Sequence, residues 1–95
     1  MVEEIENYVA LNNEFNKLNQ LSSLQDQRTE LIAMRTSLEE DKSRLLNIIK
    51  RYKECLSQTT KLELIKVIAI IDGDIDNTNI FINDVENDRQ KILNE

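Results

Sequence analysis

The sequence predicts an all-α protein, an antiparallel coiled-coil helical hairpin with an N-terminal amphipathic extension. Three observations lead to this fold class. Proline is absent and glycine occurs once in 95 residues, so almost nothing in the chain interrupts a helix. In each half of the chain, apolar residues recur at alternating intervals of three and four, which is the spacing of a coiled-coil seam. Aromatic residues make up only 4% of the chain, too few for a typical globular core.

Residues 1–20 form the first expected element, an amphipathic helix. Just after it, Leu18, Leu21 and Leu24 are spaced three and three, so we expect a slight disruption of the helix near this point. The pattern leaves open whether the segment folds back on the hairpin, extends from it or binds another chain. Its apolar face consists of Ile5, Tyr8, Leu11, Phe15 and Leu18.

Residues 24–56 form the long arm of the expected hairpin. A leucine recurs every seven residues, and a second seam position follows each leucine by three residues. Two of these second positions are polar, Gln27 and Asp41. Cys55 also falls in the pattern, so we interpret it as a small buried side chain. The apolar seam positions of this arm are Leu24, Leu31, Met34, Leu38, Leu45, Ile48 and Tyr52.

A turn is expected at residues 57–60, the one cluster of small polar residues between the two periodic stretches. Thr60 followed by Glu63 has the spacing of a capping box, which predicts the start of the return arm, residues 61–94. Gly73 lies inside this arm, where we expect the helix to be locally soft. The seam positions of the return arm are Leu64, Ile68, Ile71, Ile75, Ile82, Val85 and Ile92.

The two seams fit each other in a hairpin, because the residue numbers of facing positions then have a constant sum. In this pairing Leu31 faces Val85 and Met34 faces Ile82. Asp41 also falls in the seam, where a carboxylate needs water or a cation. A parallel dimer of the long arm would place Asp41 against its own copy, which like-charge repulsion disfavours. A single unbroken helix remains the alternative.

The net charge of −6 disfavours binding to nucleic acid. Charge is uneven, because residues 49–61 carry four basic residues and one acidic residue, whereas the rest of the chain is acidic. We expect these tip cations to steer an acidic partner, for example the acidic end of another copy, although ordinary solvated charges would look the same. The tip cations are Lys50, Arg51, Lys53 and Lys61.

No motif predicts catalysis, a cofactor, a metal or a small-molecule ligand. An EF-hand loop beginning at Asp72 would need glycine at its sixth position and glutamate at its twelfth, where this chain has Asn77 and Asn83. Cys55 has no histidine anywhere in the chain to activate it. The leucine heptads are not preceded by the basic helix of a zipper transcription factor, because residues 1–23 carry only Lys17 against four glutamates.

The expected location is intracellular and cytoplasmic. The beginning of the chain is acidic where a secretory signal would be basic. The longest apolar run, Val67–Ile71, is five residues, which is too short to span a membrane. A single cysteine cannot form an internal disulfide.

Apolar residues near the tip exceed what a two-helix seam can cover, which predicts contact with another protein or another copy. We therefore expect a non-enzymatic assembly or adaptor subunit that supplies helices to a homo- or hetero-oligomer. The alternative is a small helical chaperone or inhibitor that binds an amphipathic helix of its partner. Besides the face of residues 1–20, the expected interface residues are Ile49, Leu56, Leu62, Ile65, Val67, Ile70 and Phe81.

Overall fold

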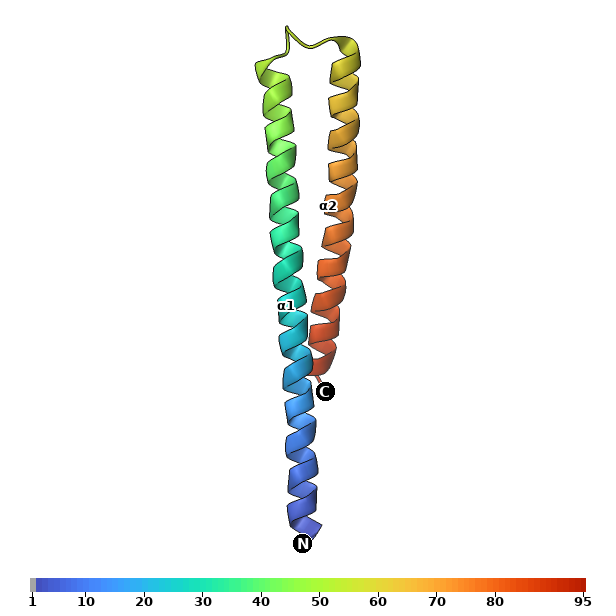
Figure 1. The fold of residues 1–95 in the computed structure, drawn as a ribbon. Helices are drawn as coiled ribbons and strands as arrows, with labels where there is room; N and C mark the ends of the chain where they lie inside the picture. Colours follow the sequence, from blue (N-terminus) through green and yellow to red (C-terminus); the bar gives the residue numbers. More distant parts are fainter. Residues whose placement is uncertain (1) are drawn as a thin grey trace.

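Two long helices form an antiparallel hairpin in the computed structural model, which describes residues 2–95, with side chains from residue 6 onward. Helix α1 spans Val2–Arg51 and helix α2 spans Gln58–Leu93. They run side by side in opposite directions in a rod of 81 × 15 × 15 Å (Figure 1). Residues 2–95 contain no strand, and the expected all-α hairpin is confirmed.

Helix α1 is continuous through the point where the leucine spacing changes. Residues 18–24 are helical, so the expected disruption is absent. Neither proline nor glycine occurs in α1, so its backbone can continue without interruption. As a result the first part of α1 extends past the end of α2 and does not fold back (Figure 1). A contact of 4.0 Å between Lys17 Nζ and Glu95 Oε2 marks the place where the two helices part.

The connection between the helices begins at Tyr52, before the expected turn. The Tyr52 carbonyl accepts bonds from the backbone amides of Cys55 (2.9 Å) and Leu56 (3.1 Å), which closes the turn. Ser57 then caps α2, and its Oγ accepts a hydrogen bond from the Thr60 amide at 3.2 Å. The N-cap of α2 therefore lies three residues before the expected N-cap Thr60, because the Ser57 side chain is already placed to accept from a free backbone amide.

Helix α2 runs without a break through Gly73, where we expected a soft point. The position of a Cβ on Gly73 has no other group within 4 Å, so the glycine is not required by close packing. The core along the contact between the helices is thin. Among residues 6–95, only Thr78, Ile82 and Val85 are buried, at 4%, 8% and 8% exposure. A two-helix contact has no third element to cover its sides.

The seam observed on α1 differs from the one expected. The position four residues after each seam leucine is half-buried, whereas the position three residues after it is exposed. Met34, Ile48 and Tyr52 consequently lie beside the seam and are exposed. The remaining expected seam residues are half-buried or buried, namely Leu24, Leu31, Leu38, Leu45, Leu64, Ile68, Ile71, Ile75, Ile82, Val85 and Ile92.

The charge of Asp41 gives the physical reason for this difference. In the expected pairing Asp41 would be enclosed against an isoleucine, at a high desolvation cost. In the structure Asp41 is exposed, and its Oδ1 lies 3.5 Å from Nη1 of Arg44 on the same helix. The half-buried Arg28, Arg35 and Lys42 occupy the seam in place of the expected positions 27, 34 and 41. Their long aliphatic stems cover apolar surface while their charged ends reach the edge of the contact.

Candidate interaction surface

One edge of the hairpin is closed by polar contacts between the helices. Arg28, Arg35 and Lys42 lie seven residues apart on α1. The Arg28 guanidinium pairs with Glu86, Arg35 Nη1 donates to Asn79 Oδ1 at 2.9 Å, and Lys42 Nζ lies 2.6 Å from Asp72 Oδ1. We call these three contacts the closed edge.

The closed edge selects the pairing of the two helices. Its partners on α2 also lie seven residues apart, so all three contacts form together in one register. If α2 slid by one heptad so that Ile65 took the place of Asp72, Lys42 would face Ile65. The Lys42 ammonium would then have no acceptor. The side chains of the two ion pairs remain 31% to 46% exposed, so each ion pair contributes only about 0.2–1 kcal/mol. The contacts therefore serve register more than stability.

The opposite edge, which we call the open edge, is hollowed and apolar. Met34 and Phe81 lie on it, from α1 and α2 respectively, and are 55% and 56% exposed. Together with Leu31 they line two adjoining hollows, which we call the middle hollow. Such exposed, unbranched and aromatic side chains can adapt to a partner surface.

Acidic residues surround the middle hollow. The lining includes four carboxylates and no basic residue. An apolar depression with a rim of one charge favours a partner whose apolar stripe is flanked by the opposite charge. The four carboxylates belong to Glu30, Asp74, Asp84 and Asp88.

A second hollow lies on the open edge nearer the tip, and we call it the tip hollow. Ile48 and Val67 line it, together with Leu45 and Ile71 from the seam. Its polar lining residues are Asp41 and Arg44.

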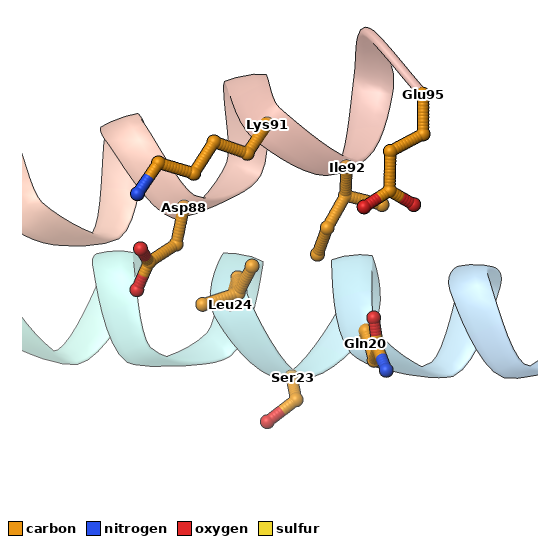
Figure 2. Close-up of a pocket in the computed structure, with 7 residues that line it drawn as sticks. All are labelled: Gln20, Ser23, Leu24, Asp88, Lys91, Ile92 and Glu95. Carbon is orange, nitrogen blue, oxygen red and sulfur yellow. The ribbon is translucent and has the colours of Figure 1, made fainter.

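A third hollow lies where α2 ends (Figure 2). Leu24 and Ile92 point toward one another between the helices at its floor, and Ser23 points away. The two apolar side chains complete the seam at this end, so we assign them to the hairpin contact. The lining consists of Gln20, Ser23, Leu24, Asp88, Lys91, Ile92 and Glu95.

The residues expected at a partner interface do not all occupy one face. Val67 lines the tip hollow and Phe81 the middle hollow. Ile49 and Leu56 are half-buried within the hairpin. The side chain of Ile5 lies outside the described residues. Those that are exposed elsewhere on the rod are Tyr8, Leu11, Phe15, Leu18, Leu62, Ile65 and Ile70.

The tip carries the expected cations. Lys50, Arg51 and Lys53 are exposed, whereas Lys61 is half-buried beside the seam. The Arg51 guanidinium carbon lies 5.5 Å from the centre of the Tyr52 ring, within the range of a cation–π contact. Most of the positive charge at the tip is thus free to meet another molecule.

Apolar spacing alone does not reveal the cations of the closed edge. Arginine and lysine ordinarily face solvent, so the spacing does not predict Arg28, Arg35 and Lys42 at the contact between the helices. Their seven-residue repeat, matched in reverse by Asp72, Asn79 and Glu86, is the sequence signal that would have revealed them. The open edge was only partly identified, because Met34 and Ile48 were assigned to the seam.

Cys55 lies in the turn and is exposed, not buried as the heptad pattern indicated, because the helix has ended before it. Among the described residues, no group of three acidic, cysteine or histidine side chains is arranged to hold a metal ion. No helix among them has the length and apolar character needed to cross a membrane.

Comparisons with protein families, with curated proteins and with solved structures found no match to this chain.

Proposed function

We propose that this protein is a non-enzymatic interaction protein, a small assembly or adaptor subunit that supplies its helical hairpin to a larger complex. The observation that carries the proposal is the exposed apolar open edge, with Met34 and Phe81 more than half exposed. Apolar hollows of this kind on a helical surface commonly receive another helix.

The exposed area supports this proposal. A compact folded chain of 11.1 kDa would expose about 5,700 Å². This chain exposes 7615 Å², an excess of about 1,900 Å² over that expectation. Each partner in an interface of standard size contributes roughly 800 Å². A hairpin of these dimensions therefore has ample surface for a stable contact.

The proposal is tested by comparing two variants of neighbouring residues on α2. Phe81→Glu places a charge in the middle hollow. Ile80→Glu is the matched control, because Ile80 is 57% exposed and Phe81 is 56% exposed. Ile80 lies two residues from both Thr78 and Ile82, which are buried, so it is on the outer side of the helix.

The measurement is cross-linking in cells of the native host, followed by mass spectrometry of the purified tagged chain. We expect the wild type and Ile80→Glu to be recovered in the same defined complex, and Phe81→Glu to be recovered alone. Recovery of the wild type only as an uncrosslinked single chain, both in cells and as the pure protein at high concentration, would refute the proposed function. A chaperone or inhibitor would instead be a monomer with its apolar open edge exposed to solvent. Its free energy of unfolding would rise only when a helical partner is added.

A further inference from the structure

We propose that the open edge binds the open edge of a second copy, in a two-fold dimer whose hairpins point in opposite directions. This inference rests on the proposed interaction function and names its partner. Two features of the open edge support it, namely the spacing of its hollows and the distribution of its charges.

The spacing of the hollows has an internal symmetry. Asp41 lies midway between Met34 and Ile48 on α1, seven residues from each. On α2, Asp74 lies midway between Val67 and Phe81, again seven residues from each. A two-fold axis through the level of these aspartates therefore exchanges the tip hollow with the middle hollow. Each apolar hollow of one copy then meets an apolar hollow of the other.

The charges favour this direction over a parallel arrangement. The middle hollow is rimmed by acidic residues and carries no cation in its lining. The tip carries the exposed Lys50, Arg51 and Lys53. Arg51 lies ten residues beyond Asp41, and Glu30 lies eleven residues before it, so the two-fold operation brings these opposite charges to the same level. A parallel dimer would instead place the cations of one tip against those of the other.

The aspartates at the axis cost some stability. Four carboxylates, from Asp41 and Asp74 of each copy, would meet there, and the Arg44 beside each Asp41 offsets part of the repulsion. This layer gives the inference a distinctive consequence. Asp74→Asn removes two of the four charges, so it should tighten the dimer. In a dimer joined through another face of the rod, the same change would have little effect.

The experiment uses the full-length chain in analytical ultracentrifugation at about 50 mM salt, with two charge-reversed variants. The first variant is Arg51→Glu with Lys53→Glu, and the second is Glu30→Lys with Asp84→Lys. Each variant alone sets like charges against each other in the proposed dimer, so we expect the dimer to weaken by at least about tenfold. An equimolar mixture pairs an acidic tip with a basic hollow and a basic tip with an acidic hollow, so dimer formation should recover.

The direction of the hairpins is read from one distance between copies. A spin label on Cys55 should lie about 40 Å from its mate in the antiparallel dimer, from the rise per residue between the axis and the tip. A short distance would show that the tips meet and would overturn the inference. Unchanged dimerisation of both charge variants would overturn it as well.

The outcomes separate this inference from the proposed function. A wild-type chain that stays monomeric when pure, yet forms the Phe81-dependent complex in host cells, refutes the second copy as partner and leaves the interaction function standing. A monomer without any partner refutes both. A dimer that survives Phe81→Glu refutes the open edge as its surface.

Discussion

The helix pairing makes a clear prediction for two residues that a simple heptad analysis would place opposite one another. Ile82 is buried at 8% exposure, whereas Met34 is 55% exposed on the open edge. Replacing isoleucine by alanine removes three carbon groups, each worth about 0.8 kcal/mol when buried. We expect Ile82→Ala to lower the free energy of unfolding by about 2 kcal/mol, with little added cavity cost because the edge can relax.

Met34→Ala removes a side chain of similar size from a position that is already more than half exposed to solvent. The expected loss is about 1 kcal/mol or less. Urea unfolding followed by circular dichroism measures both variants, at a dilution where ultracentrifugation shows a single chain. Equal losses for the two variants would mean that Met34 packs in the seam, and the pairing described here would then be wrong.

Three further changes test other parts of the hairpin. Arg28→Glu and Glu86→Arg should each lower the unfolding free energy by about 1 kcal/mol, and the doubly swapped chain should regain most of that loss in a double-mutant cycle. Ser57→Ala should cost about 1 kcal/mol in urea unfolding through loss of the α2 cap, and an unchanged midpoint would argue that another group caps the helix. Gly73→Ala should raise stability by about 0.5–1 kcal/mol because a Cβ there meets no other group, and a lower melting temperature would contradict a regular helix at this point.

The fold class could be predicted from local chemistry alone. A chain without proline and with two stretches of coiled-coil spacing leaves few alternatives to paired helices. The polar cluster between the stretches predicted the turn to within a few residues. Its details differed because Ser57, not Thr60, occupies the capping position.

The pairing of the helices could not be predicted from apolar residues alone. On α1, position 34 is methionine and position 35 is arginine, so a count of apolar groups selects Met34 for the seam. In the structure Arg35 occupies the seam instead, because its guanidinium reaches an acceptor on α2. That acceptor, Asn79, is 44 residues away in the sequence. A contact of this kind depends on both helices at once, and only the reverse-matched seven-residue repeats record it in the sequence.

The location of the open edge follows from that pairing. Once the cations close one side, Met34 and Ile48 are turned to the other side, where they meet Phe81 and Val67. The apolar residues of the sequence predict a surplus of apolar surface, mainly around the tip. The structure extends it along one edge as far as the middle of the hairpin.

The claim on which all of this depends is that the chain doubles back after Arg51. Double electron–electron resonance tests it with spin labels at Asp26→Cys and Asn87→Cys, both exposed, in a Cys55→Ser background diluted with unlabelled protein. In the hairpin these positions lie across a rod 15 Å wide, so the labels should be within about 30 Å of each other. In a single straight helix they would be about 90 Å apart, and that distance would contradict the account.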